Sequence, residues 1–415
     1  MSNEIIITTK KSMKKYFIIA IAALAASAAC SKVETIDNTP DVPVTFQAAN
    51  YTGQTKAVSV LNDFQSFKCR AFLHAQGIDL NSDGSVKTTT TYQEFFGSTG
   101  ETITPDNTTN PTEWAPSHTY YWPKGEQSFV NFVGWYGKDG SGAASDPTIT
   151  YAYDGTAGKY KATLEWAYTS ATVGNTTSNL LYADMAWRFK ANNNPATYGA
   201  DSVTEGVPML FRHALAQINL KAYVTKGDDP ADAGAITAGT TAGTVKDNNA
   251  TWTIQLKDVV ITPIYTSGTL NLTNVDPGTE ATENPWTGGW TVGSTTSNYT
   301  VAGPVAVDQV SKPASTSTAG DVIAKTCVFP QSLTSVNLTF KLYIKTEYSG
   351  GLYNEEEIPY TIAFTGGTQN LGTSAWAMNT KYTYYLKINP SQKVVLFDPA
   401  LEADWTTGTT NEQTI

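Results

Sequence analysis

The 415-residue chain has few of the residue types that build metal and redox sites. It contains three cysteines and three histidines, and none of them stands in a C-x-x-C or H-x-x-x-H spacing. Because zinc and thiol-redox sites depend on such clusters, the sequence predicts no metal and no cofactor. Cys69 and Cys327 fall in different halves of the chain, so we expect two buried thiols rather than a disulfide.

Charged residues are also scarce. Asp, Glu, Lys and Arg make up 15% of the chain, against about 25% in an average domain, and the formal net charge is −10. The basic residues form no tract, and an acidic chain is repelled by phosphate backbones, so we expect no nucleic-acid partner. The chain also lacks a G-x-S-x-G elbow, a P-loop and a strand-linked G-x-G-x-x-G, and no motif favours an enzyme.

Long hydrophobic runs are absent, and the one short run lies near the amino terminus. Residues 13–16 are partly basic, residues 17–26 are apolar, and small residues precede Cys30. A run this short predicts a secretory signal peptide over residues 1–29 rather than a spanning helix, which needs about 20 apolar residues. Residues 1–12 are then an upstream extension from a mis-chosen start codon.

The residues around Cys30 resemble a bacterial lipobox. The resemblance implies cleavage before Cys30, attachment of acyl chains such as palmitate to its sulfur, and an anchored linker over residues 30–43. Two or three acyl chains hold a protein at a membrane stably, since each buried methylene contributes about 0.8 kcal/mol. We therefore expect an outer-membrane lipoprotein. An ordinary cleavage site with an incidental cysteine is the alternative.

The chain is rich in threonine and aromatic side chains. Threonine occurs 63 times and aromatic residues make up 11% of the sequence, a balance that favours half-buried β-strands. From residue 44 onward, short alternating runs are separated by clusters of Gly, Asn, Asp, Pro and Ser, which predicts an all-β chain of antiparallel sandwiches. Residues 192–206 lack periodicity, so we expect an amino-terminal sandwich over residues 44–206 and a carboxy-terminal one over residues 207–415.

Two acidic patterns could suggest chemistry. Residues 79–84 match the first half of a calcium-binding EF-hand loop, but Thr90 stands where that loop needs a bidentate Glu, and Lys87 adds a positive charge. An Asx-rich turn is the better interpretation. The acidic runs at residues 228–229 and 355–357 lie in polar sequence, and we expect solvated loop charges rather than an acid/base pair.

Tryptophan offers a further candidate site. Trp286 and Trp290 flank a Gly-rich stretch, and exposed rings at these positions could stack on sugars, although packing in a sandwich core is the commoner use of Trp. A monomeric surface glycan-binding lipoprotein is therefore one alternative function. A secreted hydrolase is another. His213 lies in an apolar stretch, where a packed or strand-edge histidine is expected.

Several landmarks, taken in order along the chain, resemble the fimbrillin family, the lipoprotein subunits of type V pili in Bacteroidales-type bacteria. They are the lipobox at Cys30, the early strand at residues 44–48, Thr55-Lys56-Ala57, the aromatic residues between 114 and 136, Leu210-Phe211-Arg212-His213-Ala214, Phe329-Pro330-Gln331, Tyr382-Thr383-Tyr384 and residues 394–405. The match covers nearly the whole mature chain. It implies two transthyretin-like β-sandwich domains, a cell-surface or pilus location, other pilin subunits as partners and a host or bacterial surface ligand.

The resemblance also implies assembly by strand exchange. A protease cuts after a basic residue, the first strand leaves, and the carboxy-terminal strand of another subunit fills the groove. In this chain the displaced strand carries Val44, Phe46 and Ala48, and the cut follows Lys56, where the family has arginine. Residues 406–414 are polar, so either an earlier apolar stretch is donated or the subunit accepts a strand without donating one. A tip or anchor position is then as credible as a shaft position.

Overall fold

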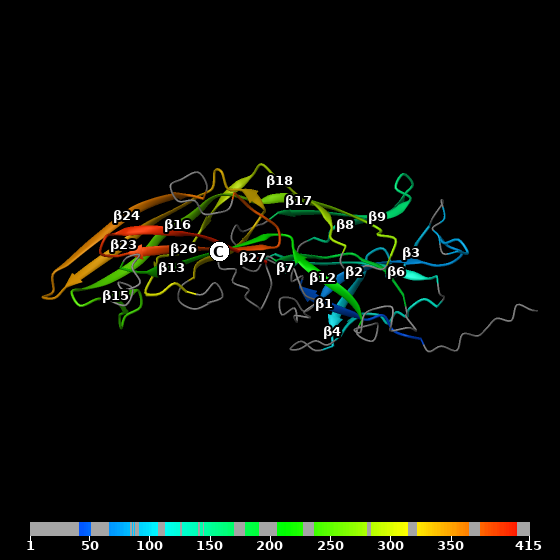
Figure 1. Cartoon of the computed structure of the whole chain (residues 1–415), viewed down its shortest axis with the longest axis horizontal. Coiled ribbons are helices and arrows are strands. Elements are labelled where there is room, and N and C mark those ends of the chain that lie inside the picture. The colour runs from blue at the N-terminus through cyan, green and yellow to red at the C-terminus, as the bar shows by residue number, and fades with distance from the viewer. Residues whose placement is uncertain are drawn as a thin grey trace, which may run out of the picture. The chain divides into compact units, whose positions relative to one another are not determined.

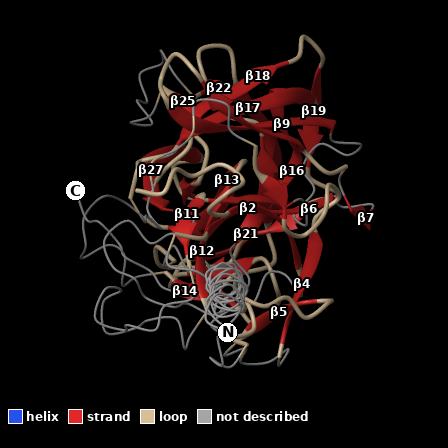
Figure 2. Ribbon diagram, turned by 90° about the vertical axis from the view of Figure 1, so that its right-hand side faces the viewer, coloured by secondary structure: helices blue, strands red, loops and turns tan. Residues whose placement is uncertain are grey.

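The computed structural model describes residues 41–50, 66–83, 85, 87, 91–106, 113–124, 127–139, 142–143, 145–169, 179–190, 206–226, 236–279, 284–313, 322–364 and 374–404. Residues 43–415 form one compact unit, to which the following description applies. Every regular element in the described ranges is a strand, as Figure 2 shows, so none of them is a helix that could cross a membrane. The all-β prediction is confirmed.

The first sheet has ten strands. They are β1 (Phe46–Asn50), β2 (Phe67–His74), β3 (Gln93–Glu94), β4 (Glu101–Pro105), β5 (Trp114–Pro116), β6 (Phe129–Asp139), β7 (Gly142–Ala143), β10 (Asn179–Ala183), β11 (Ala186–Phe189) and β12 (Val207–His213). Their order is β11-β6-β10-β12-β1-β5-β4-β2-β3, and β2 also pairs with β6. The pairings β6-β10-β12-β1-β5-β4-β2-β6 therefore close into a ring of hydrogen-bonded neighbours that contains β1.

The other strands form four sheets (Figure 1). One has the order β18 (Thr287–Val292), β17 (Ser267–Val275), β9 (Lys159–Thr169), β8 (Thr148–Asp154), and another has the order β21 (Val322–Val328), β13 (Ala216–Val224), β26 (Thr380–Asn389), β27 (Val394–Asp404). The seven-stranded sheet contains β14 (Thr237–Ala238), β15 (Thr244–Lys246), β16 (Ala250–Tyr265), β23 (Asn337–Tyr348) and β24 (Tyr353–Ala363), with β19 (Thr296–Thr300) and β20 (Val305–Ala306) on β16. A two-stranded sheet pairs β22 (Gln331–Ser332) with β25 (Ala375–Trp376).

The alternating sequence pattern explains most of these strands. In β9 and β23, nearly every second side chain is buried and those between are exposed or half-buried, as expected where one face of a strand packs on a core. In β13 all nine residues are buried, so both faces of that strand are covered. Residues 355–357, predicted to lie in a loop, belong to β24 instead, and Glu356 and Glu357 form ion pairs with Lys393 and Lys257. That expectation was wrong because a charged edge strand resembles a loop in sequence.

Strands from the second half of the sequence extend sheets formed by the first half. β12 pairs with β1 and β10, and β17 pairs with β9 over nine residues, from Ser267 opposite Thr169 to Val275 opposite Lys161. These pairings join residues from both sides of the domain boundary expected after residue 206. That boundary stays a prediction, and so does the arrangement of two transthyretin-like sandwiches.

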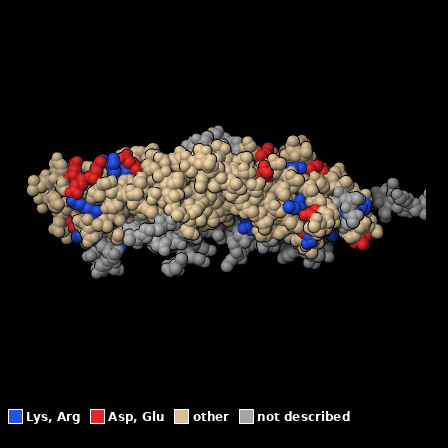
Figure 3. Space-filling model, turned by 90° about the horizontal axis from the view of Figure 1, so that it is seen from above, with Lys and Arg blue, Asp and Glu red and all other residues tan. Residues whose placement is uncertain are grey.

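Charges of both signs lie close together on the surface. On the face drawn in Figure 3, acidic and basic side chains neighbour one another, and neither sign forms a separate field. Among the described residues the pairs include Lys68 with Asp146 and Lys257 with Glu357. The face therefore offers no continuous basic surface.

Candidate assembly site around the first strand

β1 is an interior strand of the ten-stranded sheet. It runs parallel to β12 from Phe46 opposite Val207 to Asn50 opposite Phe211, and on its other side Phe46 pairs with Trp114 of β5. Two further backbone bonds fix the residues before it: the Val44 N–H donates to the Tyr120 carbonyl at 2.8 Å, and the Val207 N–H donates to the Thr45 carbonyl at 2.8 Å.

Gly206 lets the chain pass close to β1. Its φ is +94°, and a Cβ atom at this position would lie 2.7 Å from the Phe46 nitrogen. Both the left-handed backbone and the lack of space require glycine here. The start of β12 is therefore shaped for a strand lying beside it.

The strand predicted at residues 44–48 begins two residues later in the structure, and the side chains from Val44 to Ala48 alternate between core and surface. Val44, Phe46 and Ala48 are 1%, 0% and 3% exposed, whereas Thr45 and Gln47 are half-buried. The ring of Phe46 meets those of Phe67, Phe96 and Phe132 at centroid distances of 6.0, 6.2 and 5.3 Å, all edge to face. This is the arrangement that aromatic rings prefer when they pack closely. Phe46 therefore occupies a pocket of aromatic rings.

We call the hydrophobic cluster around β1 the groove cluster. Besides Val44, Phe46 and Ala48, its buried members are Phe67, Cys69, Ala71, Phe96, Ile103, Trp114, Trp122, Val130, Phe132, Leu181, Ala183, Ala186, Phe189, Val207, Met209 and Phe211. If β1 were absent, these side chains would line a trough between β12 and β5. The facing backbone groups of both strands would lose their partners.

A bulge in β11 forms one wall of this cluster. Ala186 lies opposite Phe132 and Phe189 opposite Val130, with a register shift between them. Residues three apart in a regular strand face opposite sides, yet Ala186 and Phe189 both belong to the groove cluster. The bulge centres on Arg188, whose φ of 61° is unusual for a residue with a side chain.

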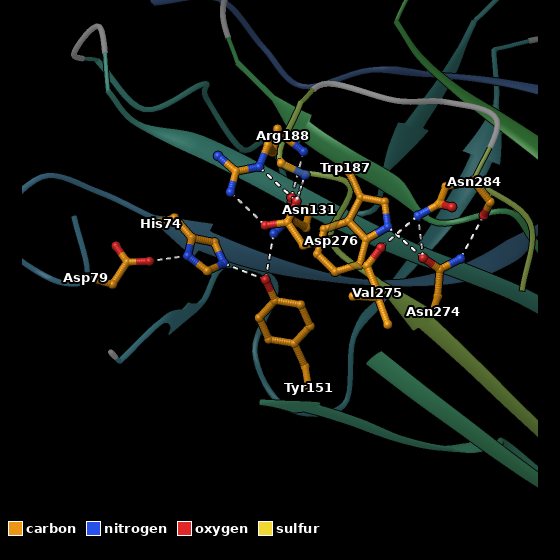
Figure 4. Close-up of polar contacts among 11 residues, drawn as sticks. His74, Asp79, Asn131, Tyr151, Trp187, Arg188, Asn274, Val275, Asp276 and Asn284 are labelled. Carbon is orange, nitrogen blue, oxygen red and sulfur yellow. Dashed lines mark hydrogen bonds and ion pairs between the residues drawn. The ribbon is translucent and has the colours of Figure 1, made fainter. Parts of the chain in front are cut away.

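A buried polar network holds this bulge in place (Figure 4). The Arg188 N–H donates to the Asn131 side-chain oxygen at 2.6 Å, and its guanidinium makes two bonds, of 2.9 and 2.7 Å, to Asp276. The same guanidinium lies 4.7 Å from the centre of the Phe129 ring. Because Asp276 is only 2% exposed, the pair is well shielded from water.

Asn131 extends the network to a buried histidine. Its amide nitrogen donates to the Tyr151 hydroxyl at 2.7 Å, and the same hydroxyl lies 2.7 Å from Nε2 of His74. Nδ1 of His74 contacts the carboxylate of Asp79. Burial, followed by the charge of Asp276, raises the pKa of Tyr151 well above its ordinary value, so its hydroxyl keeps its proton. Both the oxygen and the nitrogen of the Asn131 side chain thus form hydrogen bonds, and these bonds hold β6 in place beside the groove cluster.

The two aspartates of the acidic pattern at residues 79–84 bond to neighbouring groups of the protein. Asp79 is completely buried, and it accepts the Ala75 N–H at 3.1 Å in addition to its contact with His74. Asp83 accepts the backbone N–H and the hydroxyl of Ser85 at 3.0 and 2.6 Å, which lowers its pKa. This is the Asx turn that the sequence favoured. Within the described ranges, no three His, Cys, Asp or Glu side chains lie close enough together to hold a metal ion.

The structure shows whether the rings of Trp286 and Trp290 are exposed or packed in a core. Trp286 is buried, with its indole nitrogen donating to the Ala183 carbonyl at 2.9 Å. Trp290 is half-buried, donates to the Ala214 carbonyl at 2.6 Å and packs edge to face on Phe329 at 4.9 Å. Packing in the core, the commoner use of Trp, describes Trp286, and the Gly-rich residues after it form the strand β18. The buried ring of Trp286 is therefore not available to a sugar, and the ring of Trp290 is partly covered by Phe329.

The remaining predicted residues divide into two groups. Cys30 and Lys56 lie outside the described residues, as do Thr90 and residues 228–229 and 406–414. His213 is buried in β12, as a packed histidine should be, and its burial lowers its pKa from the ordinary 6.5 to about 3. Cys69 lies in the groove cluster, and Cys327 is buried in a separate cluster.

Sequence reasoning missed most of the residues that support the first strand. Arg188 and Asp276 are 88 positions apart, and Asn131 is 57 positions from Arg188. No spacing rule connects such distant residues. The Gly206 position carried a signal, since a glycine directly before an apolar strand is a common sign of unusual backbone.

A profile of the fimbrillin-like family matches residues 77–405. Among solved structures, a protein from Bacteroides ovatus named as a candidate for cell adhesion is 12% identical, with a TM-score of 0.41, and the match covers 89% of this chain and 100% of that one. For a protein of the same description from Bacteroides uniformis the values are 13%, 0.39, 88% and 99%.

The fimbrial anchor protein Mfa2 from Porphyromonas gingivalis also matches, at 10% identity and a TM-score of 0.26, over 89% of this chain and 99% of that one. No curated relative matches the sequence. Since the family profile extends over residues 77–405, the chain belongs to the fimbrillin-like family and is a structural or adhesive protein rather than an enzyme.

Proposed function

We propose that this chain is a cell-surface pilus subunit that accepts a strand from another subunit in place of its own first strand. The proposal has three parts: a lipid anchor at Cys30, a maturation cut after Lys56, and removal of the strand that carries Val44, Phe46 and Ala48. The acceptor is then the groove cluster.

The observation that supports this proposal most strongly is the interior position of β1. A five-residue strand at the beginning of the mature chain fills a gap between β12 and β5 and buries Phe46 completely. A sheet that lacks such a strand exposes unpaired backbone groups and apolar pockets, and an extended peptide satisfies both at once. The gap is therefore suited to a strand from another chain.

A single cut after Lys56 would release both the first strand and the lipid anchor from the rest of the chain. Lys56 lies after β1 and before β2, so cleavage there separates the first strand from the rest of the sheet. It also separates Cys30, and with it the lipid, from the rest of the chain. A cut subunit would be free to enter a filament, whereas an uncut one would keep its anchor and its own strand.

Nothing about Trp286 or Trp290 favours the alternative of a monomeric glycan-binding protein.

A controlled cut tests the proposal. In purified residues 31–415, residues 54–57 are replaced by the recognition sequence of a specific protease, and the amino-terminal fragment is displaced by mild denaturant after cutting. The emptied chain should bind a labelled peptide of residues 44–50, and an unlabelled peptide of residues 394–405 should compete for the same site. A scrambled 44–50 peptide serves as the control and should not bind.

The outcome separates the possible positions in a pilus. Ladders on a non-boiled gel would identify a subunit that both donates and accepts strands, whereas peptide binding without ladders would identify one that only accepts. An emptied chain that is still folded, yet binds neither peptide, would refute the proposal. Trypsin treatment of the unaltered chain and of Lys56→Gln then tests the natural cut site, because only the former should release the first strand.

A further inference from the structure

Glu101, at the start of β4, gathers three donors from one short segment. The Ser117 hydroxyl donates to its carboxylate, Nδ1 of His118 lies 3.0 Å from Oε1, and the Tyr120 hydroxyl donates to Oε1 at 2.9 Å. The Ser117 N–H also donates to the Thr102 carbonyl at 3.0 Å. The segment 117–120 is therefore tied down at almost every position.

The same segment holds the residues before β1. The Tyr120 carbonyl accepts the Val44 N–H at 2.8 Å, and Tyr121 forms a bridge with Pro43. The Tyr120 ring packs on Phe96 at 4.6 Å, and Phe96 in turn contacts Phe46 at 6.2 Å. Tyr120 thus connects Glu101 to the first strand through both its backbone and its ring.

The burial of Glu101 raises the free-energy cost of losing any of these hydrogen bonds. Glu101 is 9% exposed, so its carboxylate has little water to replace a lost donor. Burial alone would raise its pKa, but the hydrogen bonds from Ser117, Tyr120 and His118 outweigh it and lower the pKa. His118 itself is 77% exposed, so it adds to the cluster from the solvent side.

We propose that Glu101 is a clasp for the first strand: by fixing Tyr120, its carboxylate sets how often the residues from Val44 onward detach from the sheet. Glu101 is a positioning residue, since it acts on the first strand through its hydrogen bond with Tyr120. Its effect on pilus assembly rests on the function proposed above, whereas its effect on local opening does not. Loss of the clasp would let β1 leave more readily after a cut.

Amide hydrogen exchange of the uncut chain tests the clasp. In Glu101→Gln, exchange in residues 41–48 should become at least 10-fold faster, because the bonded Val44 N–H is exposed only when the segment opens. Exchange in β23 should not change, since that strand lies in another sheet. Glu113→Gln is the matched control, an exposed glutamate that precedes β5 in the same sheet, and should leave residues 41–48 unchanged.

A second variant keeps the test decisive if Glu101→Gln folds poorly. Tyr120→Phe removes a single hydroxyl and keeps the ring on Phe96, and it should speed exchange in residues 41–48 by a smaller factor. Equal exchange in the wild type, Glu101→Gln and Tyr120→Phe would overturn the inference, as would a uniform increase that includes β23. If the exchange result holds but the emptied chain binds no peptide, the clasp stands and the pilus function fails.

Discussion

The groove cluster and the largest hydrophobic cluster of the molecule are built from different side chains. Of the 19 buried residues around β1, eight are aromatic, whereas only six of 31 are aromatic in the cluster that joins the seven-stranded sheet to the sheet of β13 and β26. We call the latter the aliphatic core. It consists mainly of Ile, Leu and Val on long strands, such as the 16 residues of β16 and the 12 of β23.

The difference teaches how each region is stabilised. In the aliphatic core, many small contacts add up along extended strands, so no single side chain dominates. Around β1, a five-residue strand supplies few backbone bonds, and one large ring fills a pocket made by other rings. Binding of a short strand there should depend on one dominant side chain, as it does in many protein interfaces.

The strongest test of this comparison is Phe46→Ala. We expect it to lower the free energy of unfolding by about 3–5 kcal/mol, because the emptied aromatic pocket cannot collapse fully. Urea denaturation measures the change. Thr45→Ala, a half-buried neighbour that lies outside the groove cluster, should change it by less than about 0.5 kcal/mol.

Leu342→Ala provides the matching change in the aliphatic core. It should cost about 2–5 kcal/mol in the intact chain, since Leu342 is fully buried. In a chain cut between β1 and β2, however, only Phe46→Ala should speed the loss of the first strand, measured as release of the amino-terminal fragment. Equal release from both variants would show that β1 is held by overall stability and not by its pocket.

The next largest effect should come from the wall of the groove. Asp276→Asn removes the charge that binds Arg188 and leaves the guanidinium buried beside a neutral partner, at a cost of about 3 kcal/mol. The bulge in β11 should then relax, since Arg188 keeps its left-handed backbone only while it is held. Thermal unfolding and exchange in residues 186–189 measure the change. A loss of stability without faster exchange there would contradict the assigned role of the network.

Some of this architecture could be predicted from the sequence, and some could not. The alternation of β9 and β23 marks half-buried strands, so the all-β class follows from local pattern. An early strand follows as well, although it covers Phe46–Asn50 rather than residues 44–48. The burial of Trp286 did not follow in the same way, because local pattern does not show which face of a Gly-rich segment meets the core.

The support of the first strand could not be predicted at all. It depends on contacts between residues far apart in the sequence, such as Asn131 with Arg188 and Glu101 with the segment 117–120. Asp79 is a second case in which the sequence did not show the contacts of a polar side chain. Its sequence favoured an Asx-rich turn over a cation-binding loop, but it gave no sign that the fold turns the carboxylate inward to His74. Burial decides the role of such polar residues, and burial is a property of the assembled sheets.

The third effect is a pH dependence centred on His213, in the strand that borders β1. Burial lowers its pKa from 6.5 to about 3 in the folded protein. Between these values the unfolded chain takes up a proton that the folded chain does not, so the free energy of unfolding falls as the pH falls. The slope from this residue is about 1.4 kcal/mol per pH unit. Below about pH 3 both states are protonated and the contribution ends.

Urea midpoints between pH 7 and pH 4 measure this slope. His213→Asn should flatten it by removing the titrating group, whereas His118→Gln should leave it in place because His213 is retained. An unchanged slope in His213→Asn would mean that other groups dominate acid unfolding. The comparison between regions would then lose its electrostatic part, since no member of the aliphatic core titrates between pH 7 and pH 4.

The smallest effect should come from Trp286→Phe, which also separates structural from ligand-binding roles. The variant keeps a ring in the buried site but loses the 2.9 Å bond to the Ala183 carbonyl, which leaves that buried oxygen short of one donor. We expect a loss of about 1 kcal/mol in the free energy of unfolding. Retention on immobilised polysaccharide should not differ from that of the wild type, because the ring has no free face. Reduced retention at unchanged stability would instead reveal a sugar site and weaken the case for a purely structural tryptophan.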